Sequence, residues 1–311
     1  MKKSIALVAL AFGVTGAFAQ DLTSKKGEPF LPEAGDWAVA IDANPFFTYA
    51  QSIFGKTNGT APPTWNFFTN AQTITGKYFV DAQTAYRGSV RIGFGSNTVR
   101  NQVADRSVAA GSQTVFPNPV AQKENAWKNS GTTIGLAVGI EKRKGKTRLQ
   151  GYYGADAGIY ISTMKDKFTY GNALAASTTP SLNVGVTAAD DFGPGANNYN
   201  ATPTGIQGVL GAARATEVKQ GTVFSFGVRG FIGAEYFILP KMSIGGEFGW
   251  GLGLTTTGKT KTTYESVGNA SSPTVGTTVI EGSKQSGFTL DTDGKNSVWG
   301  PTGTLRFNLY F

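Results

Sequence analysis

Cysteine and histidine are both absent from the 311 residues of this chain. Without cysteine there is no disulfide to staple the fold and no lipid-anchored cysteine after an export signal. Without histidine, serine–histidine triads and most catalytic zinc sites are excluded, because both depend on an imidazole. The composition therefore predicts that the chain is not an enzyme and that it holds no cofactor and no metal.

Charged residues and long apolar runs are also scarce. Only 15% of the residues are charged, and after the first twenty residues no apolar run reaches the roughly 18 residues of a transmembrane helix. The chain is instead rich in glycine and aromatic residues, with 42 Gly, 21 Phe and 11 Tyr. Glycine and aromatic residues at alternate positions are typical of membrane β-barrels, whose apolar signal is weak in each strand.

Residues 1–19 have the three parts of a secretory signal peptide. These are the basic Lys2 and Lys3, the apolar run 5–14, and the small residues Ala17 and Ala19 of a cleavage site. We expect cleavage between Ala19 and Gln20 and export by the Sec route. Removing two of the 28 basic residues leaves 26 against 20 acidic ones, a net charge of +6. An exported chain does not meet nucleic acid, so anionic lipid headgroups are the better partner for this charge, and ordinary scatter of surface charge explains it better than either.

The stretch 222–257 has the clearest alternation in the sequence. Two runs of period two flank a turn centred on Pro240. This period predicts extended strands with one apolar face and one small or polar face. Each run is longer than the average soluble strand of about 5–6 residues and can cross a bilayer obliquely. We interpret the stretch as one hairpin of a transmembrane β-barrel.

The same alternation predicts eight strands in all. They cover residues 37–49, 65–79, 84–95, 132–143, 147–162, 222–238, 242–257 and 298–311. The connections alternate between long (51–64, 96–130, 165–220, 258–296) and short (81–83, 144–146, 239–241). An eight-stranded antiparallel transmembrane β-barrel has this pattern, with short periplasmic turns and long extracellular loops.

The predicted fold class is therefore all-β, with the barrel at 37–311 after a periplasmic lead-in at 20–36. The alternative is a soluble β-sandwich with one buried face. In a sandwich the polar parity faces water and carries Lys, Glu and Thr, whereas here it carries glycine and isolated charges.

The isolated charges on the polar parity are the candidate site. They are Asp42, Arg87, Arg91, Glu141, Arg148, Asp156, Arg229, Glu235, Glu247 and Arg306, with Arg143 near a turn. An eight-stranded interior is only wide enough for side chains to fill it. Charges buried there must pair, because an unpaired one costs several kcal/mol. We expect an ion-pair network that closes the interior; the alternative is a narrow porin-like channel for ions or small solutes.

Three motifs resemble the small outer-membrane β-barrel proteins of Bacteroidota, related in architecture to the OmpA transmembrane domain and OmpX. They are Gly35-Asp36-Trp37 with Ile41-Asp42-Ala43-Asn44-Pro45-Phe46, then Thr75-Gly76-Lys77-Tyr78-Phe79, then Gly233-Ala234-Glu235-Tyr236-Phe237-Ile238-Leu239-Pro240-Lys241. The resemblance implies a Gram-negative outer-membrane location, with outer-membrane lipid and lipopolysaccharide as surroundings. It also implies contact with the barrel assembly machinery, for which Phe307, Leu309 and Phe311 match the C-terminal signal.

The function expected from these features is a structural or surface-interaction role in the cell envelope. Loops on a rigid scaffold are the usual place of recognition. We therefore expect the long extracellular loops to be the candidate surface for a ligand or protein partner.

Overall fold

The computed structural model describes residues 22–42, 74–105, 121–174, 192–193, 213–268, 274–292 and 305–311. The predicted signal peptide and its cleavage site at Ala19 and Gln20 lie outside this part. The described chain is all-β and antiparallel, with twelve strands in one sheet. None of the described residues forms a helix long and apolar enough to cross a membrane.

The strands differ widely in length. They are β1 (Trp37–Asp42), β2 (Ile74–Asp81), β3 (Thr84–Ala104), β4 (Gln122–Lys144), β5 (Leu149–Thr169), β6 (Arg214–Lys219), β7 (Val223–Leu239), β8 (Met242–Thr257), β9 (Lys261–Gly268), β10 (Thr274–Glu281), β11 (Gln285–Thr292) and β12 (Leu305–Tyr310). The all-β antiparallel prediction is confirmed, but the prediction of eight strands is wrong, since the described residues hold twelve.

Eight of the twelve strands pair in a closed ring. The order is β1, β2, β3, β4, β5, β7, β8 and β12, and β12 pairs again with β1. The ring is staggered. Starting at Ala38 of β1, the directly paired residues can be followed around the ring in two directions. Through β2, β3, β4, β5 and β7 they reach Gly251 of β8. Through Tyr310 of β12 they reach Lys241, directly before the start of the same β8 and ten residues before Gly251.

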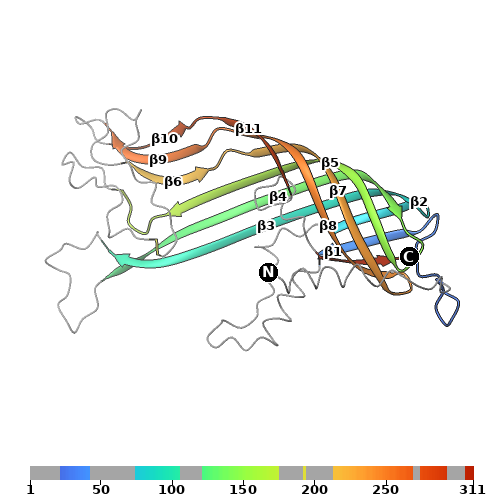
Figure 1. The fold of residues 1–311 in the computed structure, drawn as a ribbon. Coiled ribbons are helices and arrows are strands. Elements are labelled where there is room, and N and C mark those ends of the chain that lie inside the picture. Colours follow the sequence, from blue (N-terminus) through green and yellow to red (C-terminus); the bar gives the residue numbers. More distant parts are fainter. Residues whose placement is uncertain are drawn as a thin grey trace, which may run out of the picture.

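The three short connections lie together at one end of the ring, as the sequence predicts (Figure 1). They join β2 to β3, β4 to β5, and β7 to β8. In the last of them Lys241 has a positive φ of 57° directly after Pro240, the order of conformations that a type II turn requires. The side chain of Lys241 forms an ion pair with Asp36 of the lead-in. We call this end of the ring the short-turn end.

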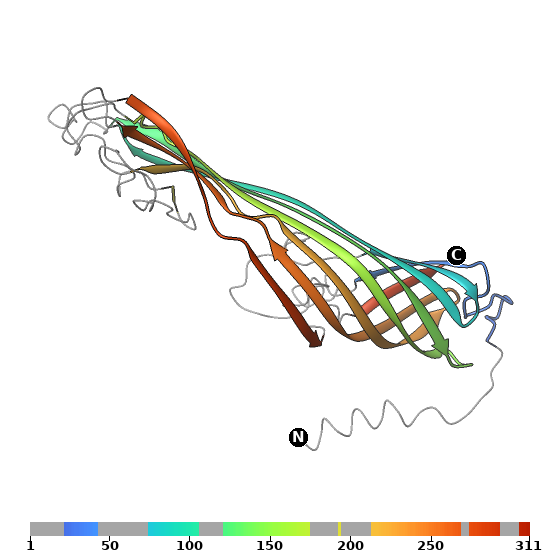
Figure 2. The same cartoon turned by 90° about the horizontal axis from the view of Figure 1, so that it is seen from above.

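At the opposite end the sheet continues beyond the ring (Figures 1 and 2). The ends of β3, β4 and β5 run on past residues 95, 131 and 163, and β6, β9 and β10 join them. We call these parts the extension. The predicted loops 96–130, 165–220 and 258–296 are thus wrong in part, because they contain strand. Serine, threonine and asparagine occupy both faces there, so the backbone pairs without an apolar alternation.

Three glycines mark the level at which the sheet leaves the ring. Gly221, Gly258 and Gly282 lie in the breaks between β6 and β7, β8 and β9, and β10 and β11. Gly258 donates to the carbonyl of Thr222, and Gly282 to that of Thr260. A Cβ on Gly221 would lie 1.8 Å from the carbonyl oxygen of Gly258. Glycine is therefore required where these two segments pass so close together.

The ring is polar inside and apolar outside. Along β7 and β8 buried and exposed positions alternate, and the exposed ones carry the large apolar side chains. Exposed examples from neighbouring strands are Ile92 (60%), Val138 (69%), Ile232 (64%) and Trp250 (55%). The buried positions of the same strands carry most of the charged residues of the ring. This is the reverse of a water-soluble sheet, in which apolar side chains are the buried ones.

Candidate interior ion-pair site

One row of paired residues runs across the ring interior. Its members, in order of neighbouring strands, are Lys77, Arg87, Gly139, Asp156, Arg229 and Gly251. Because directly opposite residues lie on the same face of a sheet, the register alone brings four charged side chains together. Two glycines in the same row leave space beside them.

Glu247 of β8 is the centre of this cluster. Its carboxylate accepts from Nη1 of Arg87 at 2.9 Å and from Nη1 of Arg229 at 2.8 Å. Nη1 of Arg306 lies 3.5 Å away. The side chain of Glu247 is fully buried. One carboxylate therefore serves three guanidinium groups, and Asp156 adds a second acid 3.4 Å from Arg229 and 3.6 Å from Arg87.

A second carboxylate, Glu141 of β4, links the cluster to the short-turn end. It is fully buried and contacts Nζ of Lys77 at 2.8 Å, Nη1 of Arg87 at 3.5 Å and Nε of Arg143 at 3.3 Å. Since Arg87 also contacts Glu247, the two carboxylates belong to one connected network.

Glu235 of β7 forms the last part of the network. It pairs with Arg143 and accepts hydrogen bonds from the hydroxyl of Tyr310 at 2.8 Å, from Ser243 at 3.1 Å and from Asn308 at 3.1 Å. These donors come from the two strands that close the ring, β8 and β12. Neutral donors satisfy the lone pairs that the single cation leaves free, as a buried carboxylate requires.

Glycines opposite the long side chains make the network sterically possible. A Cβ on Gly249 would lie 2.3 Å from Nε of Arg229, and one on Gly139 would lie 2.1 Å from the carboxylate of Asp156. A Cβ on Gly233 would meet the ring of Tyr152 at 2.3 Å. The charges and the glycines of the inner face therefore depend on one another.

Aromatic rings cover the guanidinium groups. Arg87 lies 4.0 Å from the ring centre of Phe231. Arg143 lies 5.3 Å from Phe79, 5.9 Å from Phe237 and 5.7 Å from Tyr310. Cation–π attraction is strongest where, as here, the cation is removed from water.

The lead-in packs on the short-turn end of the ring. Phe30 is buried in one apolar cluster with Phe79, Phe237 and Tyr310, and the guanidinium of Arg148 lies 3.8 Å from the Phe30 ring. Backbone hydrogen bonds between residues 35–36 and Phe79 hold the segment in place. The predicted lead-in is thus a packed part of the fold.

The structure joins seven of the ten predicted site residues. They are Arg87, Glu141, Asp156, Arg229, Glu235, Glu247 and Arg306. Arg91 instead faces the ring of Tyr160 at 5.1 Å, and Arg148 faces Phe30, and among the described residues neither forms an ion pair with the network. Both are partly exposed and outside the row of charges. Asp42 pairs with Arg306 in backbone register, but its side chain lies outside the described part.

Lys77 is a member that the prediction missed, and Arg143 is a full member although it follows a turn closely. Lys77 lies between Gly76 and Tyr78, on the polar parity, so the alternation contained the signal. Four acids and five bases therefore meet among the described residues.

This arrangement fills the interior with paired charges, one more base than acid among the described residues, and each carboxylate lies within 4 Å of at least one cation. Within the described part of the chain no cluster of Asp and Glu has the form of a metal site. The chemistry that the geometry supports is structural: charge pairing that holds opposite walls of the ring together.

Comparison with known proteins gives no identification. No family model, no curated protein and no solved structure matches this chain.

Proposed function

We propose that this protein is an integral outer-membrane β-barrel with a structural or surface-interaction role, its interior closed by the ion-pair network. The observation that carries the proposal is the inverted ring: buried charge inside and exposed Leu, Ile, Val and Phe outside. Burial of those side chains in lipid would be favourable by about 25 cal/mol per Å² of apolar surface. In water the same surface would be a large liability to aggregation.

The dimensions of the apolar surface support a bilayer. On β7 the exposed side chains of this parity extend from Phe224 to Ile238, which is about 46 Å along the strand. A tilt of about 40° reduces this to roughly 35 Å, enough to span the apolar band of about 25 Å in outer-membrane barrels. The stagger of ten residues around the ring, between Gly251 and Lys241, is the kind of offset that closing a tilted sheet requires.

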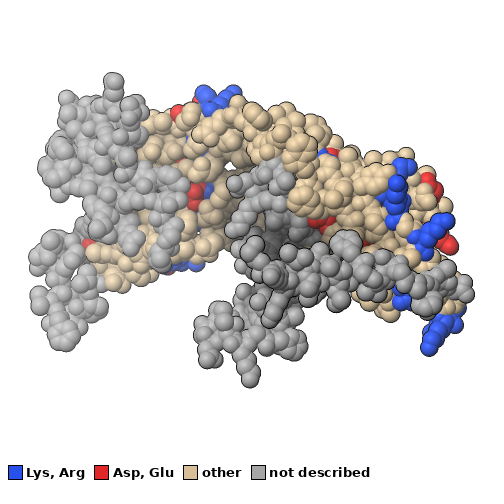
Figure 3. All heavy atoms as spheres, viewed as in Figure 1, with Lys and Arg blue, Asp and Glu red and all other residues tan. Residues whose placement is uncertain are grey.

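Exposed aromatic residues at the short-turn end also support a location in a bilayer, with this end of the ring at its surface. Trp37, Tyr78 and Tyr86 are paired neighbours on β1, β2 and β3, and Tyr153 and Tyr236 lie at the same end of β5 and β7. Tyr and Trp favour the interface between lipid and water. In Figure 3 the visible tan surface of the ring strands carries few charged atoms, and blue lysine and arginine atoms lie with some red acidic atoms at the short-turn end.

In this proposal the short turns face the periplasm and the extension reaches outward from the cell. The exposed Leu309 and Phe311, with Phe307, would then be the signal read by the assembly machinery. The extension and the connections around it would be the surface for a ligand or partner. The network that joins opposite walls favours a closed interior over the channel alternative, because a wet path needs charges without fixed partners.

The test is refolding from denaturant into detergent micelles and lipid vesicles. Folded outer-membrane barrels migrate differently on a gel before and after boiling, and we expect that shift here only when detergent or lipid is present. Floating with the vesicles in a density gradient is the second expected result. A monodisperse, folded protein in detergent-free buffer would overturn the proposal.

A further inference from the structure

Lysines form a row on the outer face, directly beyond the exposed apolar side chains. Lys165 of β5, Lys219 of β6 and Lys261 of β9 are directly opposite one another in register. Their side chains are 41%, 56% and 53% exposed. Ile161, the nearest large apolar residue on the same face of β5, is exposed too and lies about 13 Å back along the strand. The surface thus changes from apolar to basic over a short distance.

Only two carboxylates serve this row. Glu217 contacts Lys165 at 2.6 Å and Lys219 at 3.1 Å. Glu281 contacts Lys261 at 2.9 Å and the neighbouring Lys259 at 2.6 Å. Each carboxylate is therefore shared between two ammonium groups, and each trio keeps one positive charge.

Two further lysines increase the excess. Lys128 and Lys167 are directly opposite each other on β4 and β5, and the described residues include no ion pair for either. Six lysines then stand against two glutamates, a local charge of +4. Like charges directly opposite one another destabilise a sheet. An external anion would remove that cost.

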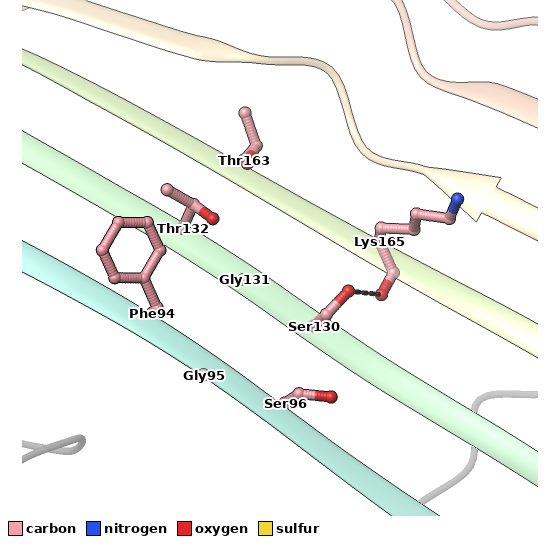
Figure 4. A pocket seen from close by; sticks show the side chains of 8 residues that line it. All are labelled: Phe94, Gly95, Ser96, Ser130, Gly131, Thr132, Thr163 and Lys165. Atoms are coloured by element: carbon pink, nitrogen blue, oxygen red, sulfur yellow. Dashed lines mark hydrogen bonds between the residues drawn. The ribbon is translucent and has the colours of Figure 1, made fainter.

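A shallow depression of about 510 Å³ lies where the row meets the apolar surface (Figure 4). Hydroxyl, apolar and basic side chains line it: Phe94, Ser96, Ser130, Thr132, Thr163 and Lys165. The hydroxyl of Ser130 donates to the carbonyl of Lys165 at 3.4 Å. Figure 4 shows the Lys165 side chain extending from β5 toward the end of β6. Hydroxyl and ammonium donors beside an exposed phenyl ring match an anionic headgroup with an acyl chain attached.

We propose that this face binds the anionic headgroup of a membrane lipid. The lysine row and the hydroxyls of the depression hold the headgroup, and its acyl chains lie along Phe94 and the apolar side chains below it. The inference rests on the proposed function, since it places the row at the edge of the bilayer. Lysines at that level attract anionic lipid strongly, and salt screens the attraction.

The absence of cysteine allows a single-site test in the full chain. A fluorophore on Thr163→Cys reports which lipids surround the depression, after the protein is refolded into vesicles. Quenching by phosphatidylglycerol with brominated chains is compared with quenching by phosphatidylcholine with the same chains. We expect phosphatidylglycerol to be favoured about fivefold or more at low salt, and less so at high salt.

Substitutions then test whether the lipid preference comes from the lysine row or from the positive surface charge of the protein in general. The triple variant Lys165→Gln, Lys219→Gln and Lys261→Gln should lose the preference, and the three arginine substitutions should keep it. Lys219→Gln alone should lower it about twofold, which covers the case in which the triple variant does not fold. The matched control changes three exposed lysines at the short-turn end, Lys25, Lys26 and Lys146, to glutamine and should leave the preference intact.

The outcomes distinguish the two proposals. Equal quenching by both lipids, or a preference that survives the glutamine substitutions, would overturn the headgroup site while leaving the barrel proposal standing. A protein that enters neither kind of vesicle would overturn the barrel proposal, and the headgroup site with it.

Discussion

The ring and the extension share three strands, β3, β4 and β5, but differ in which side chains they expose. In the ring, β3, β4 and β5 bury charges and expose Ile92, Val138 and their neighbours. In the extension polar side chains are common on both faces, and the buried residues include an apolar cluster around Phe168 and Val218 together with the charged Asp166 and Arg214. Apolar–polar alternation of side chains therefore distinguishes the ring from the extension, while backbone pairing continues through both.

The largest effect is expected from a buried carboxylate of the ring. Glu247→Gln leaves the guanidinium groups of Arg87, Arg229 and Arg306 without their shared anion, which should lower the free energy of unfolding by about 3–5 kcal/mol. The measurement is denaturant unfolding of the vesicle-bound protein. The matched change in the extension, Glu217→Gln, removes an exposed bridge and should cost less than about 1 kcal/mol. Equal losses would mean that the ring network is no more buried than the extension pairs.

The apolar cluster of the extension should unfold separately from the ring. Phe168→Ala removes a buried ring that packs against Phe192 at 5.1 Å between ring centres, at a cost of about 3 kcal/mol. Hydrogen exchange should then become faster in β6 and β9 while the ring strands stay protected. Faster exchange in β1 and β12 as well would show that the two regions form one cooperative unit.

A methyl group on the inner face of the ring should destabilise it where the same group on the outer face does not. Gly249→Ala places a Cβ 2.3 Å from Arg229, and overpacking of this kind costs about 1–3 kcal/mol. Gly246 lies on the same strand with open space beside it, so Gly246→Ala is the control and should be nearly neutral. Both are checked by the midpoint of denaturant unfolding. A larger loss for Gly246→Ala would reverse the assignment of the two faces.

The smallest effect concerns an exposed carboxylate of the extension. Hydrogen bonds from Lys259 and Lys261 lower the pKa of Glu281 from an ordinary 4.5 to about 2. A lowered pKa means that the contribution to stability is full above pH 4.5 and is lost as the pH falls toward 2. NMR titration of the Glu281 carboxyl should show the low value at low salt, and a rise toward 4.5 in Lys259→Gln. If the pKa of Glu281 were the same in Lys259→Gln as in the original chain, the Lys259–Glu281 ion pair would not persist in solution.

The sequence predicts the ring much better than the extension. Residues such as Val228, Ile232 and Tyr236 alternate with small or charged ones because the outer face is apolar, so the strands and their short turns can be read directly. The extension has no such contrast. Its strands are held by backbone hydrogen bonds and by Thr, Val and Tyr residues whose order resembles that of a polar loop, so β6, β9 and β10 were not predictable from alternation. β11 lies outside the extension and pairs with β8. Its Phe288 and Leu290 alternate with Thr289 and Asp291, so the signal for this strand was present in the sequence.

The candidate site was predictable in kind and less so in membership. Parity identified Glu141, Glu235 and Glu247 as inward, because a charge between apolar neighbours can face only the inside. Parity could not show how far each charge lies from the short-turn end of the ring, because that distance depends on the register between strands. Arg91 has the same parity as Arg87 but lies four residues further along β3, opposite Gly135 and beside Tyr160.

The central claim is that lipid surrounds the ring and water surrounds the extension. The most direct test places single cysteines at Val138, exposed on the ring, and Thr98, exposed on the extension, in protein folded into vesicles. A water-soluble thiol reagent should label Thr98→Cys rapidly and Val138→Cys slowly, with rapid labelling of both after unfolding. Equal labelling rates at the two positions in the folded, vesicle-bound protein would contradict the account.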